Sequence, residues 1–173
     1  FSRCDLAGWI AGLVLVLLVV APALGESAGA GRGAICLGNL RTLMQAWQMY
    51  AEDHEGRLAD NYHGGAARAG GWVQWGRPWA SGWLDWSTSP DNTNVVLIRN
   101  EPYSVLARYL PEETRAHRCA EDTYLPPVQR AAGWTERVRT VVMNGTMGIG
   151  NATTGPWDPI YRQVTTIDGF QFP

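Results

Sequence analysis

The chain has 173 residues, of which 46% are hydrophobic and only 17% are charged, and its formal net charge is −2. This length suits one compact domain together with one long element. Because a nucleic-acid-binding protein needs a clustered basic face, the charge balance predicts that nucleic acid is not a partner.

The N-terminal part contains an uncharged run of twenty residues from Leu6 to Gly25. As a helix it would span about 30 Å, the thickness of a bilayer core. A secretory signal peptide is one interpretation, since Ala21-Pro22-Ala23 offers a cleavage pattern, and a single membrane anchor is another. The run is longer than the usual apolar core of a signal peptide, and the FSRCD before it is not net positive.

Two details of this run favour a more specialised apolar helix. Asp5 stands at its start, where an unpaired carboxylate is costly and usually marks function. Pro22 and Gly25 stand near its end, and both weaken a helix. With more glycines up to residue 33, they predict a helix that is partly unwound near Pro22 and interrupted between about residues 14 and 34 in an assembled state.

An amphipathic helix is predicted next, ending before Gly56. Cys36 lies on its apolar face and should point towards the rest of the protein. We expect it to form a disulfide with Cys119, worth about 4 kcal/mol across so long a loop; two buried free thiols are the alternative. The apolar residues recur at steps of three and four: Ile35, Cys36, Leu40, Leu43, Met44, Trp47, Tyr50 and Ala51.

These features resemble a known family. Phe1, the acidic Asp5, the apolar run and Pro22 together resemble the mature N-terminus of a type IV pilin or of a type II secretion pseudopilin. The following CLGNLRTLMQAWQMYAEDHEGRL resembles prepilin-like proteins of planctomycetes and verrucomicrobia. Shorter matches occur at 92–100, 107–110, 117–122 and 139–148.

The resemblance implies a structural protein and not an enzyme. Residues 1–55 would form the long helix of a filament subunit, and residues 56–173 a β-rich globular head. A precursor in the inner membrane would be cleaved by a prepilin peptidase at Phe1, which would then be N-methylated. With the pilus assembly machinery, the subunits would polymerise with one another into an extracellular helical filament.

Within that filament, Asp5 is expected to form an assembly salt bridge with the amine of Phe1 from a neighbouring subunit. Two alternatives to the filament subunit stay open at this point. One is a pseudopilin of a type II secretion-like machine, and the other is a membrane-anchored periplasmic binding or sensor module.

A tryptophan-rich repeat opens the predicted head, with GWVQW at 71–75 and GWLDW at 82–86. The alternation of side chains predicts a β-hairpin with paired aromatic residues. Its tryptophans could form the core and rim of the head, a contact between subunits, or a surface that stacks on sugars. They are Trp72, Trp75, Trp79, Trp83 and Trp86.

Further strands are predicted at 95–98, 138–143 and 161–167, and a short helix at 103–110. The sequence therefore predicts an α+β fold, in which one long helix packs against a small antiparallel sheet.

No motif for catalysis, a cofactor or a metal site is found. His54, His63 and His117 are isolated, and each is expected to be a surface or hydrogen-bonding residue. The acidic group Glu52, Asp53, Glu55 and Asp60 lacks the spacing of a calcium loop and is expected to be solvated. Asn144 and Asn151 begin sequons in turn-rich sequence and are candidate glycosylation sites.

Overall fold

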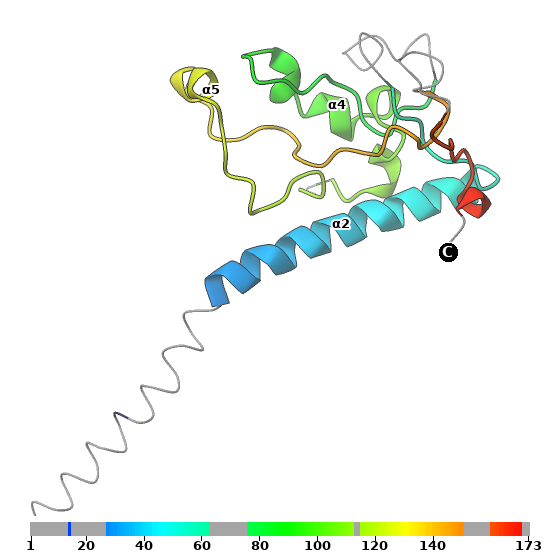
Figure 1. The fold of residues 1–173 in the computed structure, drawn as a ribbon, viewed down its shortest axis with the longest axis horizontal. Coiled ribbons are helices and arrows are strands. Elements are labelled where there is room, and N and C mark those ends of the chain that lie inside the picture. The colour runs from blue at the N-terminus through cyan, green and yellow to red at the C-terminus, as the bar shows by residue number, and fades with distance from the viewer. Residues whose placement is uncertain (1–13, 15–26, 63–75, 113–114, 151–159, 171–173) are drawn as a thin grey trace, which may run out of the picture.

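One long helix with an irregular head beside it makes up the computed structural model, which describes residue 14 and residues 27–62, 76–112, 115–150 and 160–170. The long helix is α2 (Ser27–Asp53), and two short helices follow, α4 (Val96–Arg99) and α5 (Pro127–Ala131). In Figure 1, α2 runs along one side of the head and its first turns extend past it. The described part of the head also contains four 3-10 turns: Pro90–Asn92, Glu101–Tyr103, Ala107–Tyr109 and Ile167–Gly169.

The predicted α+β fold is wrong, because the described residues contain no β-strand. Within the described residues, strand-like pairing is limited to isolated bridges, and none of them joins two of the predicted strands. Thr166 bridges to Arg57, and Val164 bridges to Met147, so the segment 161–167 pairs one residue at a time. The three bridges are Arg57–Thr166, Asp60–Pro78 and Met147–Val164.

The other predicted strands also differ from the structure. Residues 95–98 fall in and around α4. Just before the helix, the Asn94 side chain accepts from the Val96 N–H at 3.1 Å, while the N-cap residue Val95 makes no side-chain capping bond. Residues 138–143 are irregular because their N–H groups are used elsewhere: Val138 donates to the Asn92 carbonyl at 2.7 Å and Thr140 to the His117 carbonyl at 2.9 Å.

The predicted tryptophan hairpin and the helix at 103–110 are corrected as well. GWLDW at 82–86 forms no strand, and GWVQW at 71–75 lies outside the described residues. In place of one helix at 103–110, two separate 3-10 turns occur, Glu101–Tyr103 and Ala107–Tyr109.

The end of α2 matches the prediction. Glu55 and Gly56 adopt positive φ angles of 58° and 77°, which turn the chain out of the helix. The Gly56 N–H donates to the Ala51 carbonyl at 2.7 Å and so satisfies one of the last carbonyls. At the other end, the chain is helical from Ser27 onwards, so the described part of the predicted 14–34 interruption is helix in this single chain. Pro22 and Gly25 lie outside the described residues.

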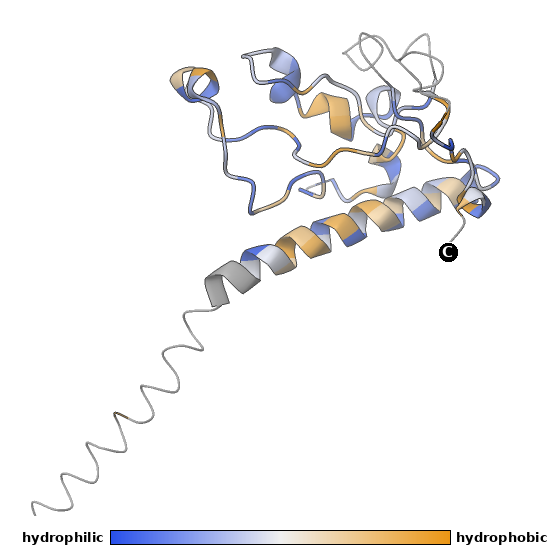
Figure 2. Ribbon diagram, viewed as in Figure 1, coloured by the Kyte–Doolittle hydropathy of each residue, from blue (hydrophilic) through white to orange (hydrophobic). Residues whose placement is uncertain are grey.

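The core lies between α2 and the head. Trp47 and Tyr50 on α2 are 7% and 1% exposed, and they pack with Trp79, Ile98 and Leu106 of the head. Hydrophobic residues on α2 alternate with polar ones along the ribbon, as a one-sided helix requires (Figure 2). In the described part of the chain, no helix combines the length and the apolar character that a membrane crossing requires.

Buried polar side chains hold the irregular head together. Asn92, Ser104 and Gln129 are all 0% exposed. The Asn92 amide donates to the Asp85 carboxylate at 2.9 Å and to the carbonyls of Ser87 and Ser89. Ser104 donates to the Trp79 carbonyl at 2.7 Å. Without a sheet ladder, buried carbonyls need partners from side chains, and these residues supply them.

Candidate functional site at the junction of the long helix and the head

A disulfide joins α2 to the head. Cys36 and Cys119 are bonded, with a sequence separation of 83 and their Cα atoms 4.6 Å apart. The predicted pairing is confirmed. Because Cys36 is in the third turn of α2, the bond fixes the head to the helix at a point well before the buried residues Leu43 and Trp47.

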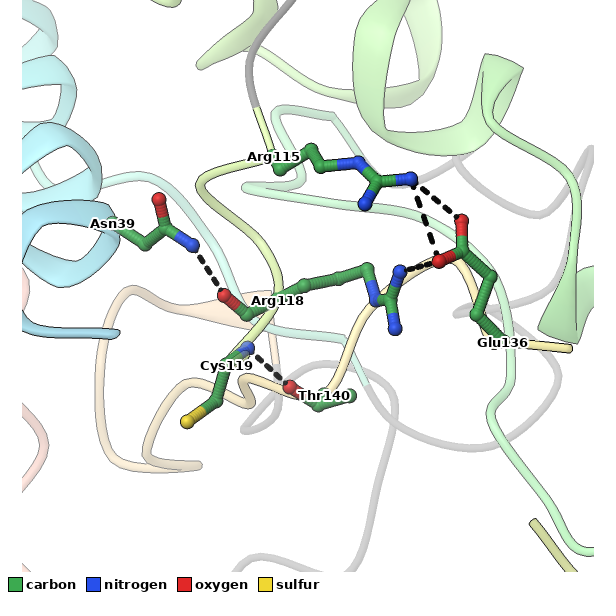
Figure 3. A network of polar contacts seen from close by, with 6 residues as sticks. All are labelled: Asn39, Arg115, Arg118, Cys119, Glu136 and Thr140. Carbon is green, nitrogen blue, oxygen red and sulfur yellow. Dashed lines mark hydrogen bonds and ion pairs between the residues drawn. The ribbon is translucent and has the colours of Figure 1, made fainter. Parts of the chain in front are cut away.

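A polar network fixes the loop that carries Cys119 (Figure 3). On one side, the Asn39 side chain of α2 donates to the Arg118 carbonyl at 2.6 Å. On the other, the Cys119 N–H donates to the Thr140 hydroxyl at 2.8 Å. Arg115 and Arg118 both pair with Glu136, Arg115 at 3.1 Å. The loop is therefore held from both sides, and α2 is docked by a covalent bond and a hydrogen bond within one turn.

Aromatic contacts fix the opposite end of α2. The Tyr50 ring stacks on His54 at 4.1 Å between centroids and meets Tyr109 edge-on at 6.1 Å. The Tyr109 hydroxyl donates to the Asp53 carboxylate at 2.9 Å, and burial together with that carboxylate raises the pKa of Tyr109. The helix is thus clamped to the head near both Cys36 and Asp53.

Between the two clamps lies an apolar cavity of about 510 Å³. Leu40 and Met44 of α2 form one wall and are 45% and 55% exposed. Across from them are Val142, which is 73% exposed, and Phe170 from the C-terminal part. The head therefore leaves one edge of the apolar face of α2 open.

The acidic residues do not come together as a metal site. Asp60 is 7% exposed; its carboxylate accepts from the Tyr62 hydroxyl at 3.0 Å and from the Ile149 N–H at 2.9 Å. Burial and this carboxylate raise the pKa of Tyr62. Asp53 is engaged with Tyr109, and among the described residues no group of His, Cys, Asp and Glu has a metal-binding arrangement. For Asp60, the expectation of a solvated acid is wrong.

A buried stack was not foreseen from the sequence. His117 is 1% exposed and stacks on Trp79 with 5.9 Å between ring centroids, and the Arg139 guanidinium lies 5.2 Å from the same ring. Burial and the positive charges of Arg139 and Arg99 lower the pKa of His117 to about 4. Burial lowers the pKa of Arg139 to about 10, and its Nη2 donates to the Gly82 carbonyl at 2.8 Å. Isolated residues in irregular sequence carry no pattern that would reveal such a contact.

The remaining predicted residues are spread over the chain. Asn144 is exposed at the rim of the cavity, and its side chain accepts from the Thr146 N–H at 3.0 Å. Of the tryptophans, Trp79 is buried and Trp86 is 60% exposed. The following lie outside the described residues: Phe1, Asp5, His63, Trp72, Trp75 and Asn151.

Comparison with known proteins returned no match to a family model, to a curated protein or to a solved structure.

Proposed function

We propose that this protein is a structural subunit of an extracellular, pilus-like filament that polymerises through its N-terminal helix. The observation that carries the proposal is the uncovered apolar stripe on α2. Leu37, Leu40 and Met44 are spaced by three and four residues and are 50%, 45% and 55% exposed. Residues at this spacing share one face of a helix, so they form one continuous surface.

This stripe continues towards an even more apolar segment. Residues 6–25, which are separated from α2 by Glu26, carry no charge at all. In sequence, the apolar stripe on α2 therefore follows the uncharged segment, with Glu26 and Arg32 between the two. A contiguous exposed patch of this kind marks an interaction site, and a second copy of the same helix offers a matching surface.

The disulfide and the Asn39 hydrogen bond support the same role. In a polymer held by its helices, any force on the head must pass through the junction between head and helix. A covalent bond between Cys36 and Cys119 keeps that junction closed under load. In this proposal the partners are other copies of the chain, a prepilin peptidase and an assembly machine, the precursor resides in the inner membrane, and nothing in the protein is catalytic.

Electron microscopy of the full chain after detergent removal tests the proposal. We expect helical filaments from the wild type. Leu37→Glu should shorten or abolish them, because it places a charge on the apolar stripe. Leu37 is outside the cavity lining, so the head should stay folded, as circular dichroism would show.

Gln45→Glu is the matched control, since it adds the same charge at an exposed position of α2 on its polar side. Filaments from Gln45→Glu but not from Leu37→Glu would support the stripe as the polymer contact. Wild-type protein that stays as single particles would contradict the filament and favour a membrane-anchored binding module. Filaments unaffected by Leu37→Glu would show that the apolar stripe is not part of the contact between subunits.

A further inference from the structure

Two exposed aromatic residues meet on the surface of the head. Trp86 is 60% exposed and Tyr124 is 59% exposed. Their ring centroids are 5.9 Å apart and the ring planes are inclined by 75°. One ring therefore stands steeply on the other, and we call the pair Trp86 and Tyr124 the aromatic corner. Large aromatic side chains left in water in this way mark a site of contact more often than isolated exposed residues do.

The Trp86 ring is held in place by a neighbouring ion pair. The Arg137 guanidinium lies 4.7 Å from the centre of the Trp86 ring, and the Arg137 side chain is only 11% exposed. It is fixed in turn by Asp122 at 3.3 Å. Because Arg137 covers one face of Trp86, the opposite face is the one presented to solvent. A site whose parts are already in place loses little entropy when a ligand binds.

The backbone on both sides of Trp86 is also anchored. The Gln129 side chain of α5 is 0% exposed and donates to the carbonyls of Asp85 at 3.2 Å and Ser87 at 2.7 Å. Helix α5 lies on the part of the head farthest from α2 (Figure 1). The corner therefore includes no residue of the apolar stripe, but it adjoins the disulfide junction, because the Asp122 N–H donates to the Cys119 carbonyl at 3.1 Å.

A small polar hollow adjoins the aromatic corner. Its volume is about 10 Å³, and Asp122, Thr123, Tyr124 and Arg137 are among its lining residues. That volume is close to the size of one water molecule or one hydroxyl group. The Asp122 carboxylate accepts one bond from Arg137 and one from the Tyr124 N–H, which leaves it capacity for a further donor.

The chemistry of the corner selects the ligand class. We propose that Trp86 and Tyr124 bind the ring of a neutral sugar, with one hydroxyl directed to Asp122. The apolar face of an aromatic ring can stack on the C–H face of a sugar, and the Asp122 carboxylate in the adjoining hollow can accept from a sugar hydroxyl. A cation is disfavoured because Arg137 already lies on Trp86, and an anion is disfavoured because Arg137 is neutralised by Asp122.

The surroundings also argue against a protein partner. Aromatic residues that anchor protein interfaces sit at the centre of a large, well-packed patch. Here the exposed residues next to the two rings in sequence, Ser87, Thr88 and Thr123, are polar.

Saturation-transfer NMR on the full chain in detergent tests this site, with cellotriose and chitotriose as the probes. We expect transfer to the ring protons of at least one sugar, with a dissociation constant of about 1 mM, which is a weak but specific affinity. Trp86→Ala and Tyr124→Ala should each weaken binding roughly fivefold or more, the loss expected for one aromatic contact.

Tyr161→Ala is the matched control, because Tyr161 is also 59% exposed and lies outside the corner. Its binding should equal that of the wild type, and the near-UV circular dichroism of all variants should show a folded head. No transfer to either sugar at about 10 mM would overturn the proposal. Equal weakening by Tyr161→Ala would overturn it too, as would concentration-dependent self-association that depends on Trp86 in the absence of any sugar binding.

Discussion

Gly148 lies so close to Asp60 that a side chain has no room there. Its φ is +68°, and a Cβ atom would stand 2.6 Å from the Asp60 Cα and 2.8 Å from the Ala59 carbonyl oxygen. We predict that Gly148→Ala lowers the free energy of unfolding by about 2–4 kcal/mol, because backbone must move to relieve the clash. Denaturant titration measures this.

Gly133 supplies the control for that prediction. Its φ of +78° is similar, but no atom lies within 4 Å of the added Cβ. Gly133→Ala should therefore lower the free energy of unfolding by only about 1 kcal/mol, which is the strain of a positive φ angle in alanine. Equal losses for the two variants would show that the close approach to Asp60 does not matter.

His117 makes stability depend on pH. Its pKa of about 4 in the folded protein is below the ordinary 6.5, since burial and the facing charges of Arg139 and Arg99 oppose protonation. The unfolded chain therefore binds the proton more readily. The free energy of unfolding should fall as the pH drops from about 6.5 to about 4, by up to about 3 kcal/mol from this residue.

His117→Gln isolates this contribution from that of the carboxylates. The variant should be less stable at neutral pH, because it loses the stack on Trp79, but its stability should fall less steeply between pH 6.5 and 4. Urea unfolding at a series of pH values gives both slopes. Parallel slopes would mean that His117 does not titrate in that window.

At the scale of elements, α2 was the predictable part of the fold. Apolar residues recur at steps of three and four between residues 35 and 51. Leu43, Trp47 and Tyr50 of this predicted face are buried, whereas Ile35, Leu40 and Met44 are 54%, 45% and 55% exposed. The same face pointed Cys36 at the head and so gave the disulfide. A long periodic pattern averages over many residues, which is why it outweighs local exceptions such as the glycines at 31 and 33.

The head could not be predicted in this way. A run such as the one at 95–98 is too short to distinguish strand from helix by periodicity, and in the structure it contributes to a four-residue helix. Elsewhere, Asn92, Gln129 and Ser104 satisfy carbonyls that a sheet would otherwise pair. Such side-chain hydrogen bonds often join residues far apart in sequence, and no local sequence pattern predicts them. The polar side of the junction, Asn39 with Arg118, was missed for the same reason.

The disulfide is the strongest link between the two elements. Replacing both Cys36 and Cys119 by serine should lower the free energy of unfolding by about 4 kcal/mol, since the bond closes a loop of more than eighty residues. Denaturant titration without reductant measures the loss, and reductant should reproduce it in the wild type. Cys4→Ser is the control and should leave the midpoint unchanged. An unchanged midpoint in the double variant would show that packing alone sets stability.

At the scale of the whole molecule, the two faces of the protein have separate tasks in our proposals. The apolar stripe lies on α2, whereas the backbone on both sides of Trp86 is bound by Gln129 of α5, a helix that lies away from α2 (Figure 1). A subunit that polymerises through its helix would leave the far side of the head free. Binding at the corner and assembly through the stripe should therefore be independent, so that Leu37→Glu spares sugar binding and Trp86→Ala spares filaments.

Assembly should depend on Asp5, which lies outside the described residues. Its carboxylate is next to the uncharged residues 6–25, so a bundle of these helices would remove it from water. An ion in such surroundings needs a partner, here the amine at residue 1 of a neighbour that the pilin resemblance predicts, with Arg3 as the competing cation.

Asp5→Ala would leave that partner unpaired in every subunit. A loss of about 3 kcal/mol per contact, the lower end for a broken buried pair, raises the concentration needed for assembly by more than about 100-fold. Electron microscopy across a concentration series should show no Asp5→Ala filaments where the wild type assembles, whereas Asp5→Glu, which keeps the charge, should still assemble. The head should stay equally stable in both variants, because its core is built from residues beyond 42. Normal filaments from Asp5→Ala would show that this carboxylate does not set the register of the polymer.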